Sequence, residues 1–193
     1  MESTSKPPSD EDPLGTFAVR FRLDSSAAST ILRVSSDPSA MIPLQAQVFL
    51  EFDGRSPYVP GVDHRITEDG AVSGVPLFVL IWDLVASCVR LIQARGSKEE
   101  VPFPPTNDVL ELERRDEMSI VRLRPNRPDS LALAETRVSL RELGRSSIMT
   151  GHLLFTWMTS TNPELKGNIR LQRFRHSLEE LGKATFAGGQ SET

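Results

Sequence analysis

The sequence predicts an α+β domain, in which a mainly antiparallel sheet of about 5–7 strands carries about three helices on one face. Segments that alternate apolar and polar residues follow one another with turns, rather than helices, between them. One long segment is apolar around most of a helical wheel, and two further helical segments end the chain. Hydrophobic residues make up 38% of the 193 positions, which is enough for a core without disulfide support.

The first part of the domain is expected to be rich in strands. Strict alternation predicts strands over 15–23 and 44–52, and the second strand ends at an Asp53-Gly54 turn. We expect a short strand over 30–35, and another over 63–67 in a segment rich in Gly, Pro and Asp.

A central helix and a second hairpin follow. Leu77 to Arg95 is predicted to be a helix that ends near Gly96, because its apolar residues cover about 200° of the wheel. A Pro-rich loop over 102–105 leads to a hairpin with strands over 110–113 and 118–124.

The end of the domain is expected to be one strand and two helices. The strand lies within 130–138, and Ser139 then begins a capping box with Glu142, which predicts a helix to about Met158. The last helix is expected over 168–181, ended by Gly182.

The distribution of charge divides the chain into three parts. Residues 1–14 form an acidic segment with a net charge of −3, which we expect to be disordered, and 187–193 are expected to be a flexible tail. Because the whole chain has a net charge of −4, the single domain over 15–186 is close to neutral. The 18 Arg and 4 Lys suggest a bacterium with a GC-rich genome.

Cysteine content and hydropathy predict a cytoplasmic protein. The single cysteine, Cys88, has no partner for an intramolecular disulfide, which is typical of a reducing compartment. The N-terminal residues lack the apolar segment of a signal peptide. The uninterrupted apolar run from Val75 to Trp82 is too short to span a membrane, so we expect no membrane interaction.

Common catalytic and cofactor motifs are absent from the sequence. It has no phosphate-binding loop, no Gly-x-Gly-x-x-Gly, no paired-cysteine metal motif and no nucleophile elbow, so no cofactor is expected. With 6% aromatic residues and no stacking motif, nucleic acid is not an expected partner.

Three carboxylates suggest one enzymatic alternative. Asp108, Glu111 and Glu113 lie on a predicted strand, and strand carboxylates of this kind hold Mg²⁺ in metal-dependent nucleases. Strict alternation places Asp108 on the opposite face from the two glutamates. We therefore favour cross-strand pairing of the glutamates with Arg122 and Arg124.

The helix that begins after Ser139 carries the best surface candidates. Arg141, Arg145 and His152 lie on one side of it, where a solvated helix face is the simplest interpretation. Leu153 and Trp157 lie outside its main apolar face, and we favour their coverage by the last helix. The functional interpretation is that these five residues bind a partner, with Trp157 as an anchor.

A stripe of small residues on the same helix predicts a close helix contact. Gly144, Ser147 and Gly151 lie within about 60° of one another on the wheel. Each glycine costs up to ~1 kcal/mol in a helix interior, so a close backbone approach is the expected compensation.

These observations favour a non-catalytic cytoplasmic binding protein. In architecture the chain loosely resembles small bacterial α+β proteins that act by binding, so an immunity-type or inhibitory partner of another bacterial protein is expected. One alternative is a metal-dependent hydrolase or nuclease that uses the strand carboxylates. The other is a structural homo-oligomer built through Leu153 and Trp157.

Overall fold

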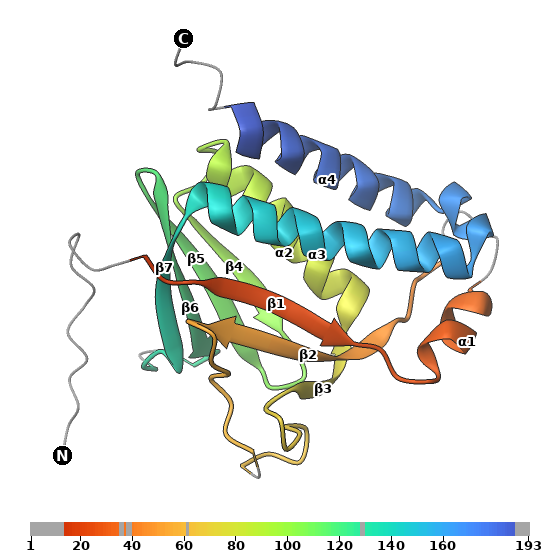
Figure 1. The fold of residues 1–193 in the computed structure, drawn as a ribbon, viewed down its shortest axis with the longest axis horizontal. Helices are drawn as coiled ribbons and strands as arrows, with labels where there is room; N and C mark the ends of the chain where they lie inside the picture. The colour runs from red at the N-terminus through yellow and green to blue at the C-terminus, as the bar shows by residue number, and fades with distance from the viewer. Residues whose placement is uncertain (1–13, 35–36, 38–39, 61, 128–129, 188–193) are drawn as a thin grey trace.

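The computed structural model describes residues 14–34, 37, 40–60, 62–127 and 130–187 (Figure 1). Within this part of the chain, seven strands form two antiparallel sheets, and four α-helices and one 3-10 helix complete the fold. The α+β class is therefore confirmed, although the strands divide into a three-stranded and a four-stranded sheet rather than forming one. The expected tails at 1–14 and 187–193 lie outside the described residues, apart from Leu14 and Ala187.

The three-stranded sheet has the order β1-β2-β3. It consists of β1 (Phe17–Arg22), β2 (Gln45–Phe52) and β3 (Val72–Pro76). Alternation along β2 buries every second side chain in the core, as predicted from its sequence. The predicted turn after β2 is confirmed, because Asp53 and Gly54 have φ angles of 53° and 74° and the chain folds back there.

The four-stranded sheet is a simple meander. Its strands are β4 (Lys98–Phe103), β5 (Asp108–Arg115), β6 (Met118–Pro125) and β7 (Ala134–Ser139), in the order β4-β5-β6-β7. Its inner face is apolar and contributes to the same core as the other sheet. The members from this face are Val101, Phe103, Leu110, Leu112, Val121, Leu123 and Val138.

Helix α2 (Leu77–Ile92) is the centre of the molecule. It contacts strands of both sheets and also α3 (Leu140–Thr161) and α4 (Ile169–Phe186). Figure 1 shows α3 and α4 side by side with α2 behind them. The wide apolar arc of α2 explains this position, because a helix that is apolar on most sides has to be covered on most sides. Among the described residues, no helix is long and apolar enough to cross a membrane.

Helix α3 covers the free edge of β1. Thr150 Oγ1 donates a hydrogen bond of 3.2 Å to the carbonyl oxygen of Val19, and Ser146 Oγ donates one of 3.5 Å to that of Phe17. Four residues of a helix rise about 6 Å and two residues of a strand about 6.6 Å, so this spacing matches hydroxyls to successive edge carbonyls. These two hydrogen bonds hold α3 against the edge of the three-stranded sheet.

The predicted close approach at the small-residue stripe of α3 is confirmed. A Cβ added to Gly144 would overlap Thr185 Oγ1 of α4, and one added to Gly151 would overlap Leu178 Cδ2 of α4. Between them, Ser147 Oγ lies 3.4 Å from Cys88 Sγ of α2. A Cβ at either position would therefore force side chains of α4 to shift where the two surface helices meet.

Two expected strands are wrong. Residues 30–34 do not form a strand, because α1 (Ala27–Leu32) covers Thr30 to Leu32, and the last residue of the expected strand lies outside the described residues. The side chain of Asp24 accepts hydrogen bonds from Ser26 N and Oγ at the start of this helix, and Ala27 and Ile31 are buried on one side of it. Residues 63–67 make only an isolated bridge to β3.

Other boundaries also differ from the sequence prediction. Strand β3 was not expected. Strand β4 extends into the predicted Pro-rich loop, because β4 is an edge strand and an edge strand tolerates a proline such as Pro102. Helix α2 ends at Ile92, with the positive φ at Ala94 rather than at Gly96. Helix α3 continues to Thr161, where the 3-10 helix η1 (Pro163–Gly167) follows, and α4 continues through Gly182.

Candidate functional site

The outer face of the four-stranded sheet carries an ion-pair network centred on Glu111. Its carboxylate lies 2.8 Å from Lys98 Nζ, 3.0 Å from Arg122 Nη1 and 3.1 Å from Arg124 Nε. Arg122 also pairs with Glu113, which confirms the predicted cross-strand pairing. The side chain of Glu111 is only 7% exposed, with Lys98, Arg122 and Arg124 around its carboxylate.

The network holds its glutamates in the charged form. Burial acts to raise the pKa of Glu111, but hydrogen bonds from Lys98, Arg122 and Arg124 outweigh burial and leave that pKa below its usual value. The hydrogen bond from Arg122 likewise lowers the pKa of Glu113. A carboxylate with several cationic partners has few lone pairs left for a metal ion.

Asp108 does not join the two glutamates. It lies on the inner side of β5, where Tyr58 Oη donates a hydrogen bond of 2.7 Å to its Oδ2. Burial raises the pKa of Tyr58, so its hydroxyl remains a donor. The geometry gives no support to the metal-dependent hydrolase, and no group of three potential metal ligands occurs among the described residues.

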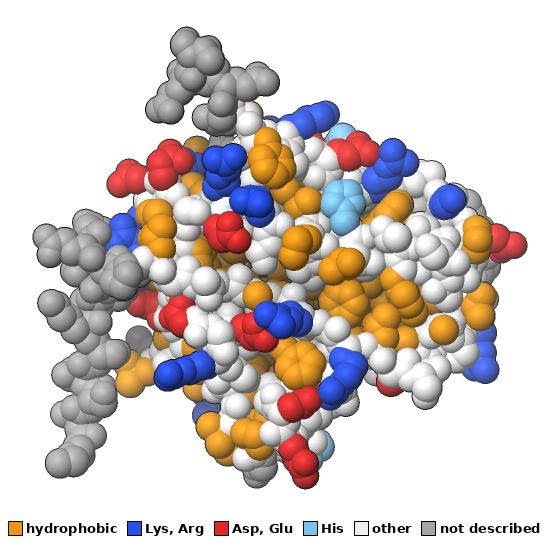
Figure 2. Space-filling view, viewed as in Figure 1, with side chains coloured by type: hydrophobic (Ala, Val, Ile, Leu, Met, Phe, Trp, Pro, Cys, Tyr) orange, Lys and Arg blue, Asp and Glu red, His pale blue; other side chains and the backbone are white. Residues whose placement is uncertain are grey.

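The predicted partner-binding residues all lie on the outer side of α3. Arg141, Arg145, His152 and Leu153 are exposed, whereas Trp157 is partly buried against the core. Figure 2 shows hydrophobic side chains over α3 and β1 on the face turned to the viewer. Their contact with a partner stays a prediction.

The favoured coverage of Leu153 by the last helix is wrong. This side chain is 62% exposed, because α4 packs on the glycine side of α3, and Leu153 lies on the other side, toward β1. Met149, one helical turn earlier, is 68% exposed. We call Arg145, Met149, His152, Leu153 and Trp157 the α3 face.

A hollow of about 370 Å³ lies beside the α3 face, where α3 meets the end of α4. Its apolar lining is Ile148 and Met149 of α3 with Phe186 of α4, which is 51% exposed. Its polar lining is Glu142, Arg145, Ser146 and His152.

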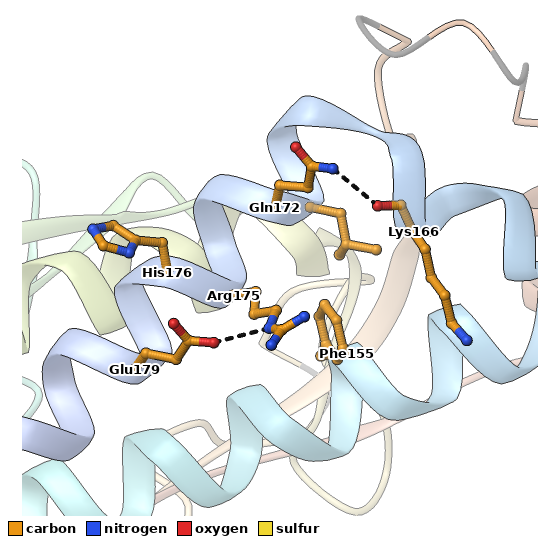
Figure 3. A pocket seen from close by; sticks show the side chains of 7 residues that line it. Phe155, Lys166, Gln172, Arg175, His176 and Glu179 are labelled. Atoms are coloured by element: carbon orange, nitrogen blue, oxygen red, sulfur yellow. Dashed lines mark hydrogen bonds and ion pairs between the residues drawn. The ribbon is translucent and has the colours of Figure 1, made fainter.

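A larger hollow of about 530 Å³ lies further along the same two helices (Figure 3). Phe155 of α3 and Leu171 of α4 provide its apolar surface. Arg175 points toward Phe155 and donates a hydrogen bond of 2.9 Å to Glu179. Its remaining lining residues are Lys166, Gln172 and His176.

The two hollows follow one another along α3 and α4, and we call them together the α3–α4 groove. His152 lines the first and Phe155 the second, and the two residues are one helical turn apart. On α4, Gly182 lies between the lining residues Glu179 and Phe186, and a Cβ added there would have no atom within 4 Å. The contact between α3 and α4 is therefore close at Gly151, on the buried side, and leaves open space at Gly182.

The residues that α4 contributes to this site were not expected from the sequence. Phe186 lies beyond the expected end of the last helix at Gly182, so the sequence did not predict a helical surface that includes it. Met149 follows Arg145 by four residues, and this spacing in a helix predicts that the two side chains lie on the same face.

Comparisons of the chain with models of protein families, with curated proteins and with solved structures found no match. The functional interpretation therefore depends on the geometry of the candidate site alone.

Proposed function

We propose that this chain is a non-catalytic binding protein that docks onto another protein through the α3 face. The observation that carries the proposal is the exposure of Met149 and Leu153, at 68% and 62%, on a helix fixed along its other sides. Contiguous exposed apolar patches often mark interaction surfaces, and Met149 and Leu153 are neighbours on α3. Trp157 lies at the end of this surface, and tryptophan is a frequent interface anchor.

The charges beside the apolar residues support the same function. Within the described part of the chain, neither Arg141 nor Arg145 forms an ion pair. In contrast, the arginines on the outer face of the four-stranded sheet are held by glutamates. Unpaired cations around an apolar surface are available for complementary charges on a partner, which accelerate association and set its orientation.

The class of binding protein we propose is an inhibitory or immunity-type partner of another bacterial protein in the cytoplasm. Such a protein acts by occupying a surface, and a rigid, preformed docking face is suited to that role. A reducing compartment agrees with Cys88, whose side chain is fully buried in the core.

Affinity capture from the organism of origin tests this function. The baits are the wild-type chain, Leu153→Asp on the α3 face, and Leu131→Asp as the control. Leu131 is 86% exposed and lies outside α3, so the control introduces the same charge at a distant exposed site. Circular dichroism verifies that all three baits are folded.

The proposal expects one stoichiometric protein partner that wild type and Leu131→Asp capture and Leu153→Asp does not. A partner captured equally by all three baits would contradict the assignment to the α3 face. Absence of any stoichiometric partner would contradict the proposed function, as would light scattering that shows a homodimer dissociated by Leu153→Asp.

A further inference from the structure

We infer that the α3–α4 groove receives an amphipathic helix with acidic flanks from the partner. This inference rests on the proposed function, because it names the partner segment that a protein-binding chain would take. It extends the site from the α3 face to residues of α4 that the sequence did not indicate.

The dimensions of the groove match a helix. Two antiparallel helices form its walls, and the α4 residues that line it run from Leu171 to Phe186, so this part of the groove is about 22 Å long. A helix laid along two antiparallel helices buries its apolar stripe between them, which is a common mode of peptide recognition. A partner segment of about 18 residues would span the groove from Lys166 to Phe186.

The groove offers apolar side chains at intervals along its length. Ile148 and Phe155 of α3 are partly buried, so their outer surfaces remain accessible, and Phe186 of α4 is 51% exposed. At Gly182 the missing side chain leaves the groove open between its two hollows. An apolar stripe on an incoming helix would therefore meet apolar side chains in both hollows.

The charges on the walls favour an acidic partner segment. Among the described residues, Arg145 and Lys166 form no ion pair, and they lie at opposite ends of the groove. Glu179 is already hydrogen-bonded by Arg175, which leaves Glu142 as the other acidic wall residue. Acidic side chains beside the apolar stripe of an incoming helix would pair with the free cations.

Binding of two designed peptides tests this inference. Both are 18-residue helices with leucines along one stripe and alanines opposite it, and they differ only in carrying glutamates or lysines at the flanking positions. Fluorescence anisotropy measures the affinity of each for the full chain. We expect the glutamate peptide to bind at least about tenfold more tightly than the lysine peptide, and the difference to decrease with added salt.

Three variants locate the binding. Arg145→Glu is expected to weaken the glutamate peptide about tenfold, whereas Arg173→Glu, on the exposed side of α4 outside the groove, should change it less than twofold. Gly182→Glu places bulk and negative charge in the open part of the groove and should abolish binding of the glutamate peptide. The fold should be retained, because glutamate is a better helix former than glycine.

Equal affinity for the two peptides, no binding of either, or full binding by Gly182→Glu would overturn the inference. These outcomes differ from failure of the proposed function, which depends on capture of a partner through Leu153. A partner lost in Leu153→Asp and retained in Gly182→Glu would keep the α3 face as the docking surface and remove the groove from it.

Discussion

Replacement of Gly151 by alanine tests the packing that exposes the α3 face. The structure places α4 so close to α3 that an alanine Cβ at this position would overlap Leu178 Cδ2 and lie 3.4 Å from Phe174 Cζ. Both neighbours are at most 1% exposed, so neither can move into solvent. Forcing a methyl group into a packed core costs about 1–3 kcal/mol.

The matched control is Gly182→Ala on α4. Both substitutions gain up to about 1 kcal/mol of helix propensity, but at Gly182 the added Cβ meets no atom within 4 Å. We therefore expect Gly182→Ala to stabilise the protein and Gly151→Ala to be about 1–3 kcal/mol less stable than this control. For a chain of this size, each kcal/mol corresponds to a change of about 2–4 °C in Tm.

Urea unfolding followed by circular dichroism measures both free energies of unfolding. The order of stability is expected to be Gly182→Ala, wild type, Gly151→Ala, with unchanged m values. Equal stability of the two variants would refute the close helix contact, and with it the physical reason for the exposure of Leu153.

Three further predictions concern charge, burial and the edge of β1. The hydrogen bond from Arg122 lowers the pKa of Glu113 in the folded state. The contribution of Glu113 to stability is therefore present above its unfolded-state pKa of about 4.3 and is lost as the pH falls through its lower folded-state pKa. Urea unfolding between about pH 7 and pH 3 should therefore show a smaller loss for Glu113→Gln than for wild type, and parallel profiles would contradict this. Burial raises the pKa of Cys88 to about 12, so its labelling by Ellman's reagent should require unfolding, and rapid labelling of the native protein would contradict its position. Thr150→Val removes a hydrogen bond to the edge of β1 and should lower the free energy of unfolding, measured by thermal unfolding, by about 0.5–1.5 kcal/mol. The control Thr156→Val, at an exposed position of the same helix, should change it by less than about 0.5 kcal/mol. Equal losses of stability in the two variants would contradict the edge contact.

Local sequence signals predicted the elements with strong periodicity. The alternation in β2 and the wide apolar arc of α2 each specify one type of structure, and both elements are where the sequence places them. The N-terminal cap of α3 was also predictable, because Ser139 Oγ accepts a hydrogen bond of 3.0 Å from Glu142 N.

Elements that depend on distant contacts could not be predicted in the same way. Residues Thr30 and Ile31 are β-branched and favour a strand locally, but burial of Ala27 and Ile31 on one side of a helix decides the conformation. Strand β4 is short, charged and contains a proline, and its pairing with β5 along one edge is what makes it a strand.

The candidate site was predictable only on α3. Spacing within one helix indicated that Arg141, Arg145 and His152 share a side, and this is a property of the helix itself. The groove depends on which side of α3 receives α4, and that choice follows from the tight fit at Gly151 together with the open space at Gly182. Such a fit between helices is a tertiary property that periodicity does not specify.

The proposed docking of the α3 face onto another protein can be measured as an affinity. The most direct measurement is the Kd of the captured partner for the Leu153→Asp and Leu131→Asp variants, determined by calorimetry under identical conditions. If the α3 face is the docking surface, Leu153→Asp weakens binding by at least about 2 kcal/mol, a roughly thirtyfold increase in Kd, and Leu131→Asp leaves the Kd unchanged. Equal Kd values for the two variants would contradict it.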